Sequence, residues 1–401
     1  MFYYICYMKE ENIKDLYPFQ YYTFKNLSVI KPYLNKYMFN LEHDNELYMG
    51  NINGLLTMGD MLPIKMLKYF TSNKNHKATF ILPENYKDTI DGLTGFREQV
   101  LEIIDYYKDS QIYIITYKVD NSDIINKMEG LKEMKFDVCI GNPPYEGQGN
   151  PLYLNICKQC VDISDTVVWL CPTQWTNTLK YVKWYDYYKK ILKCKDYEAV
   201  GNPFNETAAL ANEVGIYIFE NDGTINLDEL VYLKFANKDL AKSIWNKTQV
   251  YLQEHDNIWT FNQINYNKPY YVHNTGIRGN VKNGKPNWDW TTLFGVKAHT
   301  DFSKATTKFD STQIMWNFDT IDECRNFIDC LETDIFMFLL YCVKMNNNNH
   351  RGECKYLPWF SDYTHKWTEL QIAQELGLTK EEVDYIHEEM KDFGWKAAIK
   401  K

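Results

Sequence analysis

The sequence of 401 residues lacks any apolar stretch of the roughly 18 residues that a membrane-spanning helix requires. Its longest apolar run, residues 335–343, is about half that length and predicts a buried helix instead. Arginine is scarce as well, because only four of the 44 basic residues are Arg. Lysine must therefore provide most contacts to any phosphate group, and we expect no membrane partner.

We also expect that residues 1–8 are not a secretory signal, because they have no basic start and no small-residue cleavage site. The ten cysteines of such a chain indicate free thiols in a reducing compartment, so we expect a cytoplasmic location. Only Cys157 and Cys160 have the spacing of metal ligands, and no second pair completes a zinc set. We therefore expect no metal, and the apolar neighbours of these two cysteines predict an amphipathic helix.

The net charge of −9 argues against a protein that coats nucleic acid without specificity, because most of its surface would repel phosphate. An aromatic content of 16% excludes a disordered chain. A length of 401 residues favours two or three domains over one core.

Short apolar segments alternate with helical patterns between residues 47 and 220, which predicts an α/β fold with a mostly parallel sheet. The expected helix covers residues 96–107, and the expected strands are residues 78–82, 111–117, 136–140, 166–170 and 215–219.

Composition divides the chain into four expected parts. They are an N-terminal helical or irregular segment (1–46), the α/β domain (47–222), a mixed region (223–315) and a helical C-terminal segment (316–401). In the last part, Thr320, Thr368 and Thr379 each precede Glu or Gln by three residues, a pattern that predicts three capped helix starts.

One tetrapeptide points to chemistry: Asn142, Pro143, Pro144 and Tyr145 directly follow the predicted strand 136–140 and a glycine. Ligands of open α/β sheets bind at the carboxyl ends of the strands, where this segment is expected to lie. The alternative is a rigid turn, since two prolines fix the backbone and keep the residue before them out of the helical region.

Residues 135–145 resemble motif IV of amino-group DNA methyltransferases of the N6-adenine type, and residues 165–175 and 356–383 resemble segments of the Eco57I-like restriction-modification methylases. The resemblance implies a Rossmann-like methyltransferase domain followed by a target-recognition region. It also implies S-adenosylmethionine as cofactor, double-stranded DNA as partner, a flipped adenine as substrate and a bacterial or phage-infected host cell.

Chemistry explains why such a motif suits this reaction. An exocyclic adenine amine is a poor nucleophile, because its lone pair is delocalised into the ring. Acceptors on Asn142 and the carbonyl of Pro143 can bind the two amine hydrogens and stabilise the charge that develops on nitrogen. Pro144 helps to hold these acceptors in place, and Tyr145 offers a face on which the extruded base can stack.

The cofactor segment departs from the pattern of the family, because the turn Asp-Pro-x-x-Gly-x-Gly is missing upstream. Backbone must approach the cofactor closely there, and side chains with a Cβ obstruct it. The candidates that remain are Gly59 and Asp60 in the turn, Glu84 for the ribose hydroxyls and Asp120 for the adenine ring of the cofactor. Each of them is equally well explained as an ordinary residue at a strand end.

Residues 264–308 carry seven basic side chains among aromatic ones, against two aspartates. This composition suits a DNA groove, although a solvated β face would show it too. An Asn-Gly pair predicts a hairpin that would project lysines toward phosphates. The candidate DNA contacts are Arg278, Lys282, Lys285 and Lys297.

Two other functions fit the same residues. The chain could be a catalytically inactive methyltransferase fold that binds DNA or a partner subunit, with a role in restriction-modification or counter-defence. It could also methylate an amino group of RNA or protein, although the basic region favours nucleic acid.

Overall fold

The computed structural model describes part of the chain and divides it into two compact units. One consists of Met1–Thr173 with Val182–Leu227, and the other of Gln174–Tyr181 with Asp228–Lys401. The four-part division expected from composition stays a prediction. The described residues are 45–50, 77–84, 106, 112–117, 122–143, 145, 151–201, 213–255, 268–274, 279–282, 285–288, 294–298, 315–343 and 354–391.

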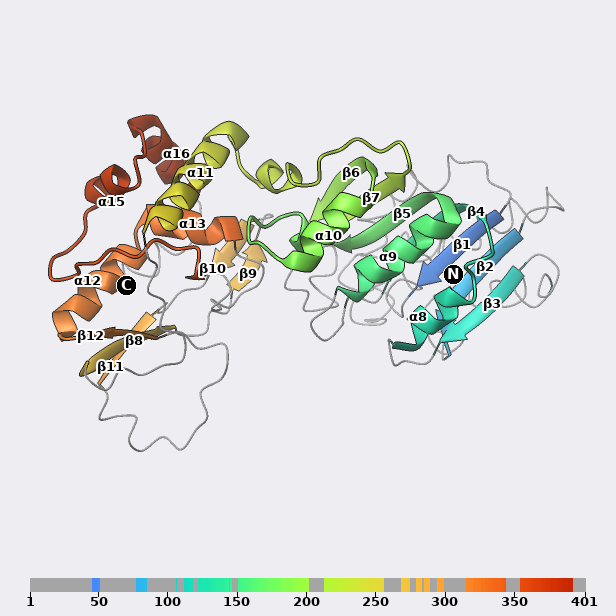
Figure 1. Ribbon diagram of the computed structural model, residues 1–401, viewed down its shortest axis with the longest axis horizontal. Coiled ribbons are helices and arrows are strands. Elements are labelled where there is room, and N and C mark those ends of the chain that lie inside the picture. Colours follow the sequence, from blue (N-terminus) through green and yellow to red (C-terminus); the bar gives the residue numbers. More distant parts are fainter. Residues whose placement is uncertain are drawn as a thin grey trace, which may run out of the picture. The chain divides into compact units, whose positions relative to one another are not determined.

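The first unit is built on a seven-stranded sheet with the order β3-β2-β1-β4-β5-β7-β6 (Figure 1). Every neighbouring pair from β3 to β5 is parallel, whereas β7 is antiparallel to both β5 and β6. Its strands are β1 (Asn45–Gly50), β2 (Lys77–Pro83), β3 (Ile112–Tyr117), β4 (Phe136–Asn142), β5 (Ser164–Pro172), β6 (Cys194–Gly201) and β7 (Val214–Glu220). The α/β fold with a mostly parallel sheet is therefore confirmed, with a mixed edge.

All five predicted strands are present as β2, β3, β4, β5 and β7, because each is a short apolar run of the kind that suits a sheet covered on both faces. Sequence reasoning missed β1 and β6. Both contain charged residues and no apolar run longer than three residues, and β6 is an edge strand with two register irregularities. The helix predicted over residues 96–107 lies outside the described residues, except for the helical Tyr106.

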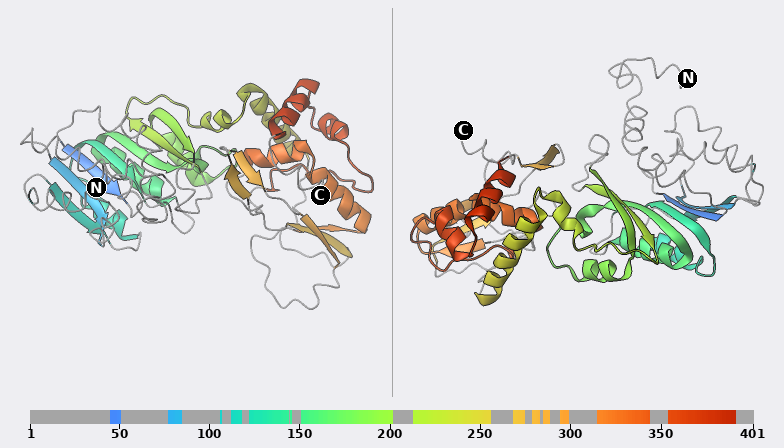
Figure 2. Two further views of the ribbon diagram at one scale, coloured as in Figure 1. Left: turned by 180° about the vertical axis from the view of Figure 1, so that it is seen from behind. Right: turned by 90° about the horizontal axis from the view of Figure 1, so that it is seen from above.

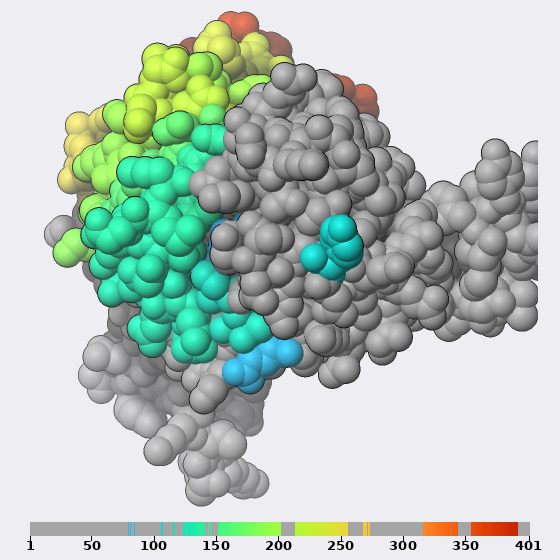
Figure 3. Space-filling model, turned by 90° about the vertical axis from the view of Figure 1, so that its right-hand side faces the viewer, coloured from blue at the N-terminus to red at the C-terminus, as the bar shows by residue number. Residues whose placement is uncertain are grey.

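Three helices cover one face of this sheet (Figure 2): α8 (Ser122–Glu129), α9 (Leu152–Ile163) and α10 (Lys183–Ile191). The predicted amphipathic helix is confirmed as α9, in which Cys157 and Cys160 are fully buried. Burial raises the pKa of both thiols well above the usual value, so they remain protonated and act as small apolar side chains. Seen from the side, described residues of the first unit from α8 onward, coloured teal to green, lie next to one another on the surface (Figure 3).

The second unit combines helices with small antiparallel sheets. Its strands form the sheet β11-β8-β12 and the hairpin β9-β10. They are β8 (Tyr270–Asn274), β9 (Gly279–Lys282), β10 (Lys285–Trp288), β11 (Phe294–Ala298) and β12 (Met315–Phe318). The described helices are η4 (Leu230–Lys234), α11 (Lys238–Glu254), α12 (Ile321–Leu331), α13 (Asp334–Val343), α15 (Glu369–Glu375) and α16 (Lys380–Met390). The short η3 (Thr173–Trp175) begins at the last residue of the first unit's segment Met1–Thr173 and continues into residues 174–181.

The predictions for the C-terminal helices are confirmed. Thr320, Thr368 and Thr379 each cap a helix, and the Glu or Gln three residues later returns the hydrogen bond in a capping box. The apolar run predicted to be a buried helix is α13, whose residues are all buried. No helix in the described part of the chain is both long and apolar enough to span a membrane.

Sequence analysis named no helix at the positions of α8, α10 and α11. The polar composition after residue 222 concealed α11, a helix of 17 residues with five buried positions. Its Asn237 cap and the spacing of Ala241, Ile244, Trp245 and Thr248 are a helical pattern that could have revealed it.

Candidate active site

The candidate tetrapeptide begins where β4 ends, at Asn142. Asn142 pairs in register with Gly50, the last residue of the parallel neighbour β1. The strand order reverses at this pair of strands, because β2 and β3 lie beyond β1 while β5 lies beyond β4. Ligands of doubly wound sheets bind in the crevice at the carboxyl ends of the strands where the order reverses.

Glycine is required just before Asn142. A Cβ built on Gly141 would lie 2.1 Å from Cζ3 of Trp169, whose ring belongs to the neighbouring strand β5. Trp169 is fully buried, and its indole Nε1 donates a hydrogen bond to the carbonyl oxygen of Tyr153 at 3.1 Å. The indole therefore holds β4, β5 and the first turn of α9 together beneath the tetrapeptide.

The structure describes the surroundings of two further members of the tetrapeptide, Pro143 and Tyr145. Pro143 is buried, whereas Tyr145 keeps part of its surface exposed. The ring of Tyr145 meets that of Tyr153 edge to face, with centroids 6.3 Å apart and planes at 77°. Burial of the phenol, with a smaller effect of Cys171, raises the pKa of Tyr145 well above its ordinary value. The ring is therefore neutral at physiological pH and can stack on a planar ligand.

Tyr185 of α10 also lies near Tyr153. Burial is the main cause that raises the pKa of Tyr185 to about 12, and the nearby Tyr153 side chain opposes the shift. Cys171 of β5 is fully buried in the same region. These groups make an apolar, uncharged floor, in which a polar ligand group would interact strongly with the few acceptors at the strand ends.

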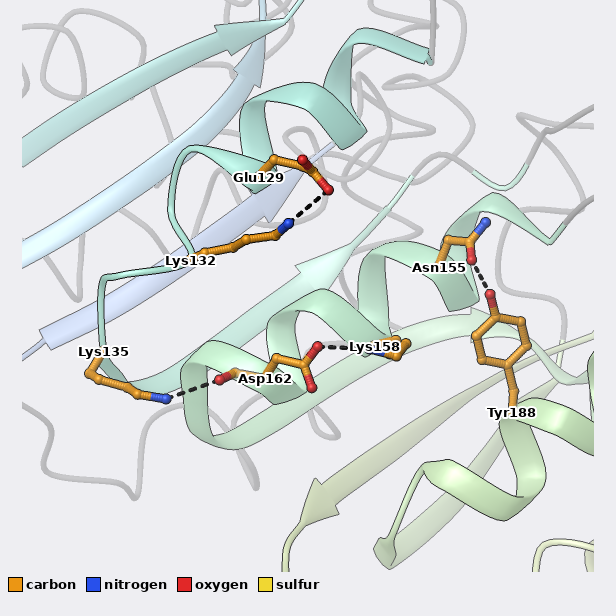
Figure 4. A network of polar contacts seen from close by, with 7 residues as sticks. All are labelled: Glu129, Lys132, Lys135, Asn155, Lys158, Asp162 and Tyr188. Atoms are coloured by element: carbon orange, nitrogen blue, oxygen red, sulfur yellow. Dashed lines mark hydrogen bonds and ion pairs between the residues drawn. The ribbon is translucent and has the colours of Figure 1, made fainter.

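Polar contacts on the helical face hold α9 and α10 in place (Figure 4). Lys135, directly before β4, donates to the carbonyl oxygen of Asp162 at 3.0 Å, and Lys158 pairs with the carboxylate of Asp162 at 2.8 Å. The Tyr188 hydroxyl of α10 donates to the side chain of Asn155 in α9. These contacts position the helices around the candidate site and leave its chemistry to the strand ends.

Of the predicted cofactor residues, only Glu84 lies among the described ones. It is exposed in the turn directly after β2, the parallel neighbour of β1. Gly59, Asp60 and Asp120 lie outside the described residues. Sequence reasoning missed Gly50, which ends the interior strand β1, although the apolar residues before it and the Asn and Gly that follow it are a strand and turn pattern.

The predicted DNA contacts belong to the small sheets of the second unit. Lys282 ends β9 and pairs with Lys285, which begins β10, so the predicted hairpin at the intervening Asn-Gly is confirmed. Lys297 lies in β11, and Arg278 lies outside the described residues. The role of these residues stays a prediction.

One cluster in the described part of the chain brings three potential metal ligands within 4.8 Å of one another: Asp334, Glu369 and His387. His387 already contacts both acids, with Nδ1 at 2.8 Å from Asp334 and Nε2 at 3.2 Å from Glu369. The backbone nitrogen of Asp334 also donates to Glu369 at 2.7 Å. These contacts join α13, α15 and α16, so the three side chains stabilise the packing of these helices without a metal ion.

No protein-family model and no curated protein sequence matches the chain. Three similar solved structures are a proposed RNA methyltransferase from Pyrococcus horikoshii, a proposed methyltransferase from Escherichia coli and a chain of a type I restriction-modification system. They share 13%, 11% and 12% sequence identity with TM-scores of 0.28, 0.27 and 0.30. The matches cover 48%, 49% and 57% of this chain and 83%, 85% and 50% of the other chains. Likenesses this distant carry no argument about the chemistry of the chain.

Proposed function

We propose that the chain transfers a methyl group from S-adenosylmethionine to the exocyclic N6 amine of a flipped adenine in double-stranded DNA. One observation carries the proposal: the Asn-Pro-Pro-Tyr tetrapeptide begins at the carboxyl end of β4, in register with the end of β1 at the reversal of the strand order. A motif that resembles an adenine clamp thus coincides with the expected ligand edge of the sheet.

The proposed roles follow from the chemistry of the residues. The side chain of Asn142 and the carbonyl of Pro143 would accept hydrogen bonds from the target amine and favour a nitrogen that points toward the methyl donor. The half-buried ring of Tyr145, held edge to face by Tyr153, would stack on the extruded base. No protein group has to remove a proton before the methyl group is transferred.

Part of the expected cofactor site fits S-adenosylmethionine. Gly50 ends β1 without a Cβ that would block a close approach of the ligand. The exposed carboxylate of Glu84, at the end of the adjacent strand β2, suits ribose hydroxyls, as acidic residues do in doubly wound nucleotide sites. When bound, S-adenosylmethionine supplies the electrophilic methyl group.

A transfer assay tests this function. The purified chain is incubated with S-adenosylmethionine carrying a labelled methyl group and with duplex DNA of mixed sequence, single-stranded RNA or a protein mixture in parallel. The proposal requires label in the DNA and N6-methyladenine in its nucleoside digest. Label that appears only in RNA or protein would assign another substrate, and its absence from every sample would favour the inactive, DNA-binding alternative.

The affinity for S-adenosylmethionine is expected to be weak, with a Kd on the order of 0.1 mM or poorer for the isolated chain. Residues 55–60 contain one glycine, Gly59, next to Met58, and the acidic glycine-rich turn is missing. Lost hydrogen bonds there reduce affinity about tenfold for each ~1.4 kcal/mol. Calorimetry with the cofactor and its demethylated product measures this constant. A micromolar Kd without DNA would contradict the prediction.

Replacing Lys282 and Lys285 together with Gln is expected to weaken duplex binding to a similar degree for all sequences, because lysine contacts to phosphate carry no base information. The slope of log K against log salt should fall in magnitude by about 1.8, the value for two phosphate contacts. Fluorescence anisotropy of a labelled duplex at several salt concentrations gives this slope. Lys366→Gln is the control, since Lys366 pairs with Asp329 at 2.8 Å. Equal slopes for all three proteins would place the DNA path elsewhere.

A further inference from the structure

Helix α10 of the first unit exposes two large aromatic side chains. Trp184 and Tyr187 are 42% and 49% exposed and lie three residues apart, on one face of the helix. Tyr185 and Tyr188, on the inner face, are only 5% exposed and pack into the unit. Packing within the unit therefore accounts for the two inner tyrosines of α10 but not for the two exposed aromatic side chains.

Helix α10 and the residues directly after it are rich in lysine. Between Lys183 and Lys195 the sequence has five lysines and one aspartate, in a chain whose net charge is −9. Lys183, Lys190 and Lys193 are exposed, and none of the three forms an ion pair with another described residue. Lys183 and Lys190 are seven residues apart and flank Tyr187 on its own face of α10. We call Lys183, Trp184, Tyr187 and Lys190 the α10 stripe.

Helix stability does not explain this arrangement. Lysines in the last turn, such as Lys190, complement the negative end of the helix dipole. Lys183 begins the helix, where a positive charge is unfavourable. The side chain of Lys183 is therefore better accounted for by a negatively charged ligand than by the helix itself.

The α10 stripe leads toward the carboxyl edge of the sheet. Strands β5 and β6 are both antiparallel to β7 and hence parallel to each other, and α10 connects them. A helix between parallel strands runs back from the carboxyl edge to the amino edge, so Lys183 and Trp184 lie nearest the edge at which β4 ends with Asn142.

We propose that the α10 stripe binds a segment of single-stranded nucleic acid, with bases stacked on Trp184 and Tyr187 and phosphates bound by Lys183 and Lys190. Exposed aromatic rings bind bases whose faces are open, and a duplex hides those faces. Alternating lysines complement the backbone charge of such a strand. The inference shares a nucleic-acid partner with the proposed function but requires no methyl transfer.

Anisotropy of a fluorescein-labelled thymidine 20-mer, without cofactor, tests the α10 stripe in the full chain. Trp184→Ala and Tyr187→Ala should each weaken binding about tenfold, the effect of one lost stacking contact. Lys183→Gln with Lys190→Gln should lower the magnitude of the salt slope by about 1.4, the value for two contacts to a single strand. The matched control is Lys127→Gln with Lys132→Gln, two exposed lysines of α8 and the turn after it. Circular dichroism confirms that each variant is folded.

The binding results either support or overturn the proposed role of the α10 stripe. Weaker binding in the stripe variants and unchanged binding in the α8 control support the proposal, whether or not the chain methylates duplex DNA. A wild-type chain that does not bind the 20-mer overturns it, even if duplex methylation is observed. Binding that survives in both aromatic variants overturns it as well. A dimer that dissociates in Trp184→Ala, seen by sedimentation, would assign the stripe to a second copy of the chain instead.

Discussion

Replacing Asn142 with alanine is expected to lower the rate of methyl transfer at least ~100-fold while the fold and DNA binding persist. In the proposed site, Asn142 supplies one of two acceptors that stabilise the charge on the adenine nitrogen, and removing one such preorganised group has an effect of this size. Asn142 is the last residue of β4, and the backbone pairing of this position with Gly50 does not require a particular side chain. Single-turnover rates with a saturating duplex measure the effect without a contribution from product release.

A conservative variant separates chemistry from structure. Asn142→Asp keeps an acceptor oxygen of the same reach, so its loss of rate should be clearly smaller than that of Asn142→Ala. Thermal unfolding of both variants should match that of the original chain. If Asn142→Ala retains full activity in a folded sample, the tetrapeptide has no part in the reaction and serves as a rigid turn.

Sequence analysis found the strands that consist of consecutive apolar residues. β5 and β7 bury nearly every residue, and such strands appear in the sequence as short apolar runs. The capping boxes of the C-terminal helices were equally predictable, since both partners of each box lie within four residues. Such local patterns can be predicted without knowledge of distant contacts.

The elements that were missed depend on contacts distant in sequence. β1 includes Asn45 and Glu46, and its pairing with β2 and β4 places it at the centre of the sheet. β6 is stabilised by pairing with β7 along an edge, where polar side chains are tolerated. The cofactor turn was predicted at residues 54–61 without knowledge that β1 ends at Gly50, and its place stays a prediction.

The candidate site also has one part that the sequence predicts and one part that depends on distant contacts. The tetrapeptide was evident from residue types alone, whereas the need for glycine at position 141 comes from an indole 28 residues further along the chain. A sequence shows that Gly141 and Trp169 exist, but only the register of β4 with β5 makes them neighbours. The support beneath a motif is therefore harder to predict than the motif.

The packing of Trp169 against Gly141 can be tested by adding one methyl group at position 141. Gly141→Ala is expected to lower the free energy of unfolding by about 3 kcal/mol, the upper part of the usual range for an overpacked core. The new Cβ would lie 2.1 Å from Cζ3 and 2.5 Å from Cε3 of Trp169, a rigid side chain that is fully buried and cannot turn aside. Methyl transfer should fall too, because Asn142 follows directly. Urea unfolding of the full chain measures the change in stability.

A second substitution shows whether the indole is the cause. Gly130→Ala is the control, because its Cβ would meet only the Lys127 carbonyl oxygen, at 3.3 Å in an exposed turn, and its effect should stay within about 0.5 kcal/mol. Trp169→Leu alone should destabilise the chain by leaving a cavity and removing the hydrogen bond to Tyr153. In Gly141→Ala with Trp169→Leu, the added methyl group enters space that the indole has left, so the double variant should be more stable than the sum of the single effects predicts. Strict additivity, or an unchanged urea midpoint for Gly141→Ala, would show that the indole does not hold β4 beneath the tetrapeptide.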